Sequence, residues 1–479
     1  MLDQTFSSQN FNYIFLKENR KGTFDKDYLA KEYLDKHEEF KQLINEKNSL
    51  RQRNNGLTQE ELDQYKEQFD KVNKEKELIR TENFHLVSNE IHEKDFNFNI
   101  IHKPGDEIYI AQKSLAVFFA MKQLQHNISK TFKVLQSNRN YIVKQLYGLV
   151  GDGYPKVIIR TDIESFYESI PQDKLLQKIE GNNLLSSLSK KLIKKIFYEF
   201  ESVKDTTIIN PGKGIPRGVA ISPLLAELYL KDLDREIQSI PDLIYYARYV
   251  DDIVAIFCPK TASTKRVYIK EIEERVTNSG LSLSTPKTEI IDVLDKGVFN
   301  KSFTYLGYKF ELLQTANDFK TFIEISDAKL DRYNQRLKLA VENYNVSSKY
   351  NEPIARSMLI ARIKFLTGNY HLNNTKRNIK TGLFYSNAML LLNKGNFKSL
   401  KALDRLLMQN LQLLCPPVKI GIDKQNMVKF LNVRFSFSKS YNLRERAFYS
   451  FRLSSREVKY YRKKYGRIVS AFEVIKSVW

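Results

Sequence analysis

The stretch "ARYVDDIVAIF", residues 247–257, places two adjacent carboxylates in an otherwise apolar run. Val, Ile and Phe favour a buried strand, but a carboxylate is costly to bury without a partner. The acids therefore mark a break, and we predict two short strands within residues 243–257 with the turn at Val250 and Asp251. Adjacent carboxylates at such a turn repel each other unless a cation lies between them, so this turn predicts a metal site.

A third acid stands at the end of another predicted strand. In "VIIRTDIESFYESI", residues 157–170, Asp162 closes an apolar run. Carboxylates from Asp162, Asp251 and Asp252 would suit two hard ions about 3.5–4 Å apart, an arrangement that serves phosphoryl transfer. Because this set contains no His or Cys, its ligands are all oxygen, which favours Mg²⁺ or Mn²⁺ and argues against zinc.

The elements between these acids predict the sheet. A helix follows Pro171, and "SPLLAELYLKDLDREI" begins another with Ser222 at the N-cap and Pro223 at the first helical position. A further helix stops at "NSG" before a strand within residues 281–292. The order strand, helices, hairpin, helix, strand predicts a split β-α-β arrangement, an α+β fold with an antiparallel sheet and helices on one face.

The flanking regions are predicted to be mainly helical. The charged N-terminal part predicts two helices separated at residues 54–57, the second with a capping box of Thr58 and Glu61. Alternation on both sides of "KPGDE" predicts a hairpin within residues 97–112. After Phe310, apolar residues recur at three-and-four spacing, which is typical of helices.

The charge of the chain indicates its class of partner. Lys and Arg number 77 and Asp and Glu 56, which gives a net charge of +21 over 479 residues. This excess favours a polyanion, because phosphate contacts gain affinity by releasing counterions. The alternative is a solvated basic surface without a specific ligand. We favour nucleic acid, since aromatic side chains, 12% of the residues, can also stack on bases.

Residues 439–467 concentrate this pattern, with ten Lys or Arg, two Glu and seven aromatic residues. The mixture predicts contact with a structured RNA or a single strand through phosphate contacts and base stacking. The alternative is a basic amphipathic helix that packs on a helical domain.

Cysteine usage and hydropathy indicate the compartment. Cys258 and Cys415 are the only cysteines, so we expect neither a disulfide framework nor a clustered zinc site. The first residues lack a basic start followed by a long apolar stretch, and nowhere do about eighteen apolar residues run together. We therefore expect a soluble, cytoplasmic protein without membrane contact.

Five segments occur in an order that resembles the palm motifs of reverse transcriptases: "DIESFY" at 162–167, "GIPRGVAISPLL" at 214–225, "YVDD" at 249–252, "LSLSTPKTEI" at 281–290 and "FTYLGYKF" at 303–310. One such motif is weak, whereas five in order are specific. The resemblance covers about residues 97–310 and is greatest to prokaryotic enzymes of the retron and group II intron kind. It implies a right-hand polymerase with fingers and a ferredoxin-like palm, followed by a helical thumb and a C-terminal extension.

The resemblance implies roles for the residues of the first motif and the hairpin. Asp162 and Asp251 would ligate the metals, with Asp252 as the third carboxylate and Ile163 assigned to the same metal site. Tyr167 matches the steric gate of the family, an aromatic ring under the sugar that leaves no room for a 2′-hydroxyl. The alternative for Tyr167 is ordinary core packing.

The remaining motifs imply contacts with nucleotide and primer. Gly214, Pro216 and Gly218 would let the backbone approach the incoming nucleotide and the template. Lys287 matches the lysine that neutralises or protonates the leaving pyrophosphate, and the alternative is a solvated loop lysine. Residues 305–308 resemble the hairpin that grips the primer end.

Two features depart from the family's pattern. Arg217 stands where these enzymes usually carry glutamine, and its guanidinium would bind the triphosphate or a template phosphate, which leaves nucleotide specificity open. The usual Arg-containing strand of the fingers is not found. Lys103, Lys113 and Arg139 are therefore the candidates for the triphosphate cations.

Two later segments, "RIKFLTGNYHL" at 362–372 and "KTGLFYSN" at 380–387, resemble parts of the bacterial defence-associated reverse transcriptases. Within that group they are most similar to the type 3 class, which works as a two-polymerase system with a non-coding RNA. The resemblance implies antiviral defence, a dedicated non-coding RNA, and a second reverse transcriptase or self-association.

Together these patterns predict an RNA-directed DNA polymerase that adds dNTPs to a 3′ end by two-metal nucleotidyl transfer. The predicted domains are a helical N-terminal region at 1–96, fingers and palm at 97–310, and a helical thumb with a basic C-terminal region at 311–479. The alternatives are a retron-type reverse transcriptase, an RNA-dependent RNA polymerase and a catalytically silent RNA-binding scaffold. Tyr167 argues against the RNA polymerase, and the complete set of three carboxylates argues against the scaffold.

Overall fold

A computed structural model describes the chain except for residues 1–2, 22–23, 25–27, 52–57, 104, 106, 260–266, 294–296, 373–378, 418–422 and 444–446. The chain divides into two compact units. Unit 1 comprises Met1–Ser137, Asp162–Pro241 and Val267–Thr285, and unit 2 comprises Asn138–Thr161, Asp242–Arg266 and Pro286–Trp479. Both units therefore contain residues from the predicted range 97–310, and the division crosses one strand between Thr161 and Asp162.

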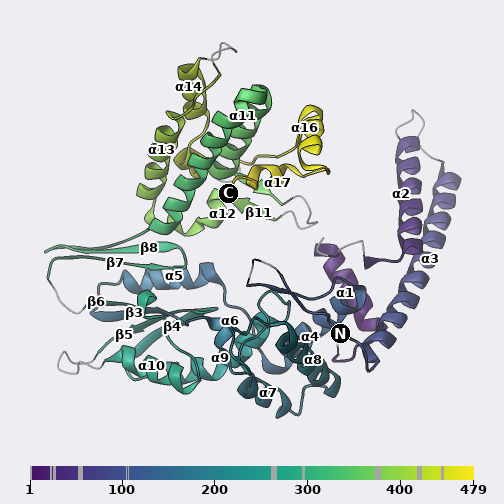
Figure 1. Ribbon diagram of the computed structural model, residues 1–479, viewed down its shortest axis with the longest axis horizontal. Coiled ribbons are helices and arrows are strands. Elements are labelled where there is room, and N and C mark those ends of the chain that lie inside the picture. The colour runs from purple at the N-terminus through teal and green to yellow at the C-terminus, as the bar shows by residue number, and fades with distance from the viewer. Residues whose placement is uncertain are drawn as a thin grey trace. The chain divides into compact units, whose positions relative to one another are not determined.

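Unit 1 is mainly helical. Its elements are α1 (Ser8–Lys21), α2 (Lys31–Arg51), α3 (Gln59–His92), β1 (Ile101–His102), β2 (Tyr109–Ile110), α4 (Leu115–Phe132), α6 (Phe166–Ser169), α7 (Gln172–Glu180), α8 (Ser187–Val203), α9 (Ser222–Gln238) and α10 (Tyr268–Asn278). The predicted N-terminal helix pair is confirmed as α2 and α3, which lie side by side (Figure 1). Thr58 and Glu61 form the predicted capping box, while the predicted separator at 54–57 lies outside the described residues.

Two local predictions for unit 1 had different outcomes. The predicted hairpin is confirmed, because β1 and β2 pair antiparallel with Ile101 opposite Ile110. The predicted N-cap at Ser222 is wrong by one residue: Ile221 is the N-cap of α9 and makes no side-chain cap. The Ser222 hydroxyl instead donates a hydrogen bond to the Pro216 carbonyl at 2.7 Å, so it closes the preceding turn.

A four-stranded sheet carries the predicted acids. It contains β3 (Lys156–Asp162), β4 (Leu243–Tyr249), β5 (Asp252–Phe257) and β6 (Glu289–Val293) in the order β4-β5-β3-β6. The pairs β4–β5 and β3–β6 are antiparallel. Helices α6 to α9 separate β3 from β4 along the chain, and α10 separates β5 from β6. This order is that of a ferredoxin-like palm, as the sequence predicted.

The chain after Phe310 begins with strands rather than helices. β7 (Phe299–Tyr305), β8 (Tyr308–Gln314) and β9 (Phe319–Ile325) form an antiparallel three-stranded sheet. The predicted boundary at 310 therefore falls inside β8, because inward and outward side chains continue to alternate there. Helical structure begins later, with α11 (Asp327–Thr367), whose backbone is kinked at Asn351.

The rest of unit 2 is mainly helical. Its other elements are α5 (Arg139–Val150), β10 (Asn369–His371), β11 (Lys380–Gly382), α12 (Leu383–Ser386), α13 (Lys398–Leu411), α14 (Lys424–Arg434), α15 (Phe437–Leu443), α16 (Ser455–Tyr465), α17 (Ala471–Lys476) and the 3-10 helices η2 (Thr285–Lys287) and η3 (Ala388–Asn393), of which η2 begins at the last residue of unit 1. The segments 362–372 and 380–387 meet as the antiparallel pair β10–β11.

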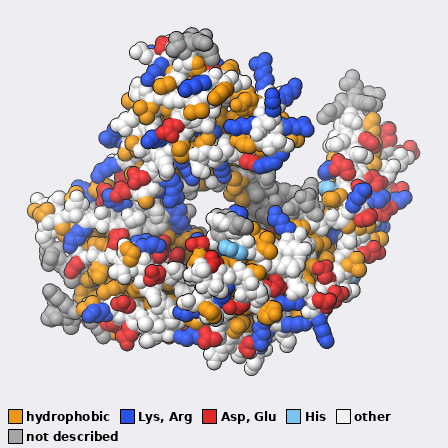
Figure 2. Space-filling model, in the orientation of Figure 1, with side chains coloured by type: hydrophobic (Ala, Val, Ile, Leu, Met, Phe, Trp, Pro, Cys, Tyr) orange, Lys and Arg blue, Asp and Glu red, His pale blue; other side chains and the backbone are white. Residues whose placement is uncertain are grey.

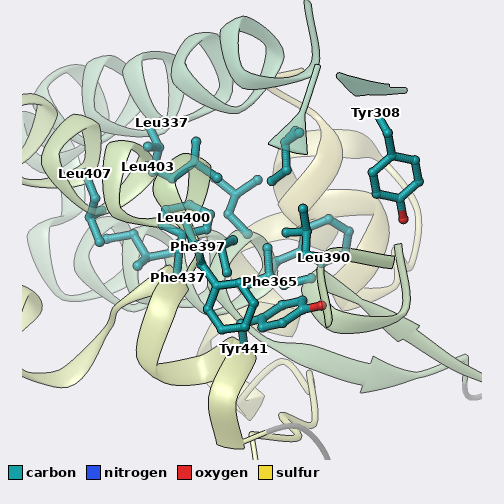
Figure 3. Packing of buried hydrophobic residues seen from close by; sticks show 14 of the residues in the cluster. Tyr308, Leu337, Phe365, Leu390, Phe397, Leu400, Leu403, Leu407, Phe437 and Tyr441 are labelled. Atoms are coloured by element: carbon teal, nitrogen blue, oxygen red, sulfur yellow. The ribbon is translucent and has the colours of Figure 1, made fainter. Parts of the chain in front are cut away.

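The apolar core of unit 2 joins α11 to the helices that follow it. Leu337 from α11 is buried together with Leu400 and Leu403 from α13, and Phe437 and Tyr441 from α15 lie in the same cluster (Figure 3). Burial of each large apolar side chain contributes roughly 1.5–3 kcal/mol to folding. None of the helices in the described part of the chain has the length and apolar character that a membrane span requires.

Candidate active site

The structure brings the three predicted aspartates together on the four-stranded sheet. Asp162 is the last residue of β3, and Asp252 is the first residue of the neighbouring strand β5. Asp251 lies in the two-residue turn that joins β4 to β5, next to the cross-strand pair Tyr249 and Asp252. One carboxylate oxygen from each aspartate lies within 4.8 Å of the others. Positions that are 89 residues apart in sequence, 162 and 251, thus converge.

The turn that carries Asp251 has an unusual backbone. Val250 adopts a positive φ of 61°, a conformation that is strained for a β-branched residue. The Arg248 guanidinium donates a hydrogen bond to the Val250 carbonyl at 2.8 Å. Arg248 is only 7% exposed, so this contact supports the turn from the buried side. The hydrogen bond from Arg248 therefore fixes the carbonyl of the residue that precedes Asp251.

The donor set fits a divalent cation. Asp162 is 4% exposed, and three carboxylates within 4.8 Å of one another repel unless positive charge lies among them. All three donors are hard oxygen ligands, which Mg²⁺ and Mn²⁺ prefer. The Arg160 guanidinium supplies one cation from the protein, donating to the Asp252 carboxylate at 2.9 Å.

Ile163 and Tyr167 follow Asp162 in unit 1. Ile163 pairs with Leu283 as an isolated antiparallel bridge, and its side chain is 1% exposed. Only its backbone could therefore serve the metal site to which the sequence assigned it. Tyr167 lies in α6, half-buried, with its ring 5.3 Å from that of Phe166. This position is compatible both with a gate for the sugar and with packing, so the gate stays a prediction.

The glycine-rich motif serves close packing within unit 1. The Val219 amide donates to the Pro216 carbonyl at 3.1 Å, and Gly218 in this turn has a φ of 99°. A Cβ at position 218 would lie 2.8 Å from the Tyr109 carbonyl oxygen and 2.5 Å from the Ile108 side chain. Gly218 thus permits the approach of the β1–β2 hairpin, a role that the sequence reasoning missed. Nothing in the local sequence indicates which segment approaches.

The predicted cations of unit 1 lie at its surface. Arg217 has a side chain that is 51% exposed, and its guanidinium lies 3.4 Å from Glu107 and 3.9 Å from Glu168. Exposed pairs of this kind contribute little to stability, so a phosphate could replace them at low cost. Lys103 and Lys113, at the hairpin β1–β2 and just beyond it, are also exposed. Their assignment to the triphosphate stays a prediction.

Arg139 belongs to unit 2 and contacts the predicted primer hairpin. Its Nε donates to the Leu306 carbonyl at 3.1 Å, and its Nη2 donates to the same oxygen. The guanidinium also lies 5.1 Å from the ring centre of Tyr308. Arg139 therefore braces the β7–β8 turn, and this engagement argues against its predicted role as a triphosphate cation. Lys287 ends η2 with an exposed side chain.

The basic C-terminal segment exposes its cations and buries part of its rings. Tyr441 and Tyr461 are 0% and 6% exposed and pack in the core of unit 2, so the prediction of stacking on bases is wrong for these two rings. Tyr465 is 39% exposed, and for this ring stacking stays a prediction. The cations point outward and cluster over α16 (Figure 2): Arg452, Arg456, Lys459, Arg462, Lys463, Lys464 and Arg467. This surface is suited to phosphate contacts.

Comparison with known proteins identifies the domain. Residues 109–310 match the family model "Reverse transcriptase (RNA-dependent DNA polymerase)". No curated protein sequence matches the chain.

Among 241 matching chains of solved structures is apo telomerase from Candida tropicalis, truncated from its C-terminal domain. It is 15% identical, with 42% of this chain and 44% of that chain covered and a TM-score of 0.30. Telomerase from Candida albicans, in complex with a TWJ fragment of telomeric RNA, is 12% identical, with 68% and 56% covered and a TM-score of 0.31. The chain thus spans about half the length of these structures.

The family match includes all three aspartates and the complete four-stranded sheet. The order of that sheet agrees with the right-hand polymerase fold that the sequence predicted. A reverse transcriptase domain also implies dependence on a divalent metal, for which the aspartates offer ligands. Residues 109–310 of this chain are therefore a reverse transcriptase domain, the nucleotidyltransferase domain of RNA-directed DNA polymerases.

Proposed function

We propose that this protein is an RNA-directed DNA polymerase that adds dNTPs to a 3′ end on an RNA template. The observation that carries the proposal is the convergence of Asp162, Asp251 and Asp252 within 4.8 Å inside a reverse transcriptase domain. Asp162 and Asp251 would hold two Mg²⁺ ions, with Mn²⁺ as a substitute. When bound, such ions activate the attacking hydroxyl and stabilise the departing pyrophosphate oxygen.

The test is primer extension on an RNA template with purified protein, in which dNTPs and NTPs are supplied separately. We expect extension with dNTPs and little extension with NTPs. Extension with NTPs alone would instead identify an RNA-dependent RNA polymerase. Absence of extension with either set, in protein that still binds RNA, would identify the scaffold alternative.

The ring of Tyr167 is expected to select between dNTPs and NTPs. If its half-buried ring lies under the sugar, Tyr167→Ala removes the group that excludes a 2′-hydroxyl, and we expect discrimination between dNTPs and NTPs to fall by roughly 100-fold. The measurement is the ratio of kcat/KM for the two nucleotides. Tyr198→Ala is the matched control, because Tyr198 is 76% exposed on α8. An unchanged ratio in Tyr167→Ala would show that this ring only packs.

The partner of the basic α16 surface is proposed to be the RNA backbone. Its cations are exposed, which favours sequence-independent phosphate contacts. We expect the triple variant Lys459→Gln, Arg462→Gln and Lys463→Gln to weaken RNA binding roughly tenfold. The plot of log K against log salt should become shallower, its negative slope losing roughly two to three in magnitude, because each lost phosphate contact removes about one.

The control for this experiment is a matched triple on α3, Lys66→Gln, Lys71→Gln and Lys74→Gln, whose side chains are also exposed. It removes the same charge from a different surface. An equal loss of affinity in both triples would mean that only net charge matters, and α16 would have no specific role.

We further propose a cytoplasmic role in antiviral defence, with a dedicated non-coding RNA and a second reverse transcriptase or self-association. The support is the resemblance of residues 362–372 and 380–387 to defence-associated enzymes, two segments that pair as β10 and β11. Sequencing of the nucleic acid that co-purifies with the protein tests the RNA partner. Phage plating on cells with the intact protein and with Asp251→Asn tests the defence role, since a role that needs synthesis is lost in the variant.

A further inference from the structure

Arg160 joins two parts of the candidate active site. It stands two residues before Asp162 on β3, so both side chains project from the same face of that strand. Its Nη2 donates to a carboxylate oxygen of Asp252 at 2.9 Å, and its Nη1 donates to the Lys287 carbonyl at 2.9 Å. The Glu289 carboxylate lies farther away, at 3.8 Å. One guanidinium thus binds the first residue of β5 and the segment that precedes β6.

The environment of this contact makes it stronger than a surface ion pair. The side chains of Arg160 and Asp252 are 15% and 24% exposed, so solvent screens their charges only in part. The Arg160 Nε is buried and has no hydrogen-bond partner among the described residues. The two Nη contacts therefore determine how the guanidinium is oriented. The bond to the Asp252 carboxylate joins two charged groups, and the bond to the Lys287 carbonyl is assisted by the charge of the arginine.

We propose that Arg160 is a positioning residue that retains Asp252 as its ion-pair partner and fixes the backbone that carries Lys287. Asp162 and Asp251 are then the two carboxylates left to hold divalent ions. The positive charge of Arg160 also limits the negative charge of the aspartate cluster. This inference rests on the proposed polymerase function, because it assigns different tasks to the three acids of that site.

A contact between Arg160 and the nucleotide triphosphate is the competing explanation. Arg commonly binds phosphates through both Nη groups, but here each Nη already has a protein partner. These two bonds already fix the plane of the guanidinium on the protein, so a triphosphate could reach only the N–H groups that they leave. The two explanations predict effects on different kinetic constants. Loss of a triphosphate contact raises KM for dNTPs, whereas loss of positioning lowers kcat.

The deciding measurement is calorimetric titration of the protein with Mn²⁺ in the absence of nucleotide. In Arg160→Leu the cluster loses a neighbouring cation and Asp252 loses this ion pair, so we expect Mn²⁺ to bind roughly three- to tenfold more tightly. Primer extension by the same variant should show kcat lowered roughly tenfold or more, with KM for dNTPs within twofold of the original value.

Arg160→Lys separates charge from geometry. Lysine keeps the positive charge but lacks the planar fork that reaches Asp252 and the Lys287 carbonyl together. We expect Mn²⁺ affinity near that of the unchanged protein and a reduced kcat. The hydroxyls of Thr161 and Thr288, 2.7 Å apart, still join β3 to the segment after Lys287, so these variants should fold.

Three further variants complete the test. Arg235→Leu removes an arginine whose side chain is 67% exposed on α9 and should change neither readout. Asp251→Asn should weaken Mn²⁺ binding strongly. In Asp252→Asn protein, Arg160→Leu should tighten Mn²⁺ binding less, because no carboxylate is released. Equal Mn²⁺ affinity in Arg160→Leu and the original protein, together with a raised KM, would overturn the proposal. If the original protein extends no primer yet Mn²⁺ binding tightens as described, the pairing stands and the polymerase assignment fails.

Discussion

Asp251→Asn is expected to lower the rate of nucleotide incorporation by at least roughly a thousandfold. Asn keeps the size of the side chain but loses the negative charge that holds a divalent ion. The bond from Arg248 to the Val250 carbonyl does not involve the side chain of Asp251, so we expect the turn to keep its shape in this variant. Asp162→Asn should have an effect of similar size, because Asp162 ends the adjacent strand.

The measurement is single-turnover extension of a primed RNA template at saturating Mg²⁺. Asp63→Asn, at an exposed position of α3, is the control for loss of one acidic group. Asp252→Asn should cost less than Asp251→Asn, because Asp252 is paired with Arg160. Retention of activity within tenfold in Asp251→Asn would show that the aspartate cluster is not the catalytic centre.

Gly218→Ala is expected to destabilise unit 1 by roughly 2–4 kcal/mol. Two costs combine, since the residue has a positive φ of 99° and its new Cβ would lie 2.8 Å from the Tyr109 carbonyl oxygen. The Ile108 side chain can rotate away, but the backbone oxygen moves only with the hairpin. That shift would also disturb the hydrogen bond from the Tyr109 amide to the Arg217 carbonyl, 2.7 Å in length.

Gly212→Ala is the matched control. Gly212 has a similar φ of 71°, but nothing lies within 4 Å of its Cβ position, so this change costs only the backbone strain, about 1 kcal/mol. Urea unfolding measures both variants. In the absence of urea, the rate of primer extension should fall by roughly tenfold or more for Gly218→Ala and little for Gly212→Ala. Equal destabilisation by the two variants would show that the hairpin adapts without cost.

Local sequence patterns were sufficient to predict the features that depend on neighbouring residues. The Thr58 capping box, the hairpin β1–β2 and the turn at Val250 and Asp251 all formed where the local pattern predicted them. These features depend on residues within a few positions of one another, because a cap or a tight turn closes hydrogen bonds between near neighbours. The order of strands and helices then restricted the sheet to a ferredoxin-like order, which places Asp162 beside the β4–β5 turn.

The contacts between residues that are distant in sequence depend on the tertiary structure. Arg160 pairs with an acid 92 positions away, and Arg139 braces a carbonyl 167 positions away. Periodicity indicates that a residue is buried, but the partner depends on how the strands and helices pack. For the same reason Tyr441 could be recognised as aromatic in a basic segment, while only the packing of α15 against α12 and α13 buries it. The extra strand β9 and the continuation of β8 likewise depend on pairing between strands, which local propensity does not specify.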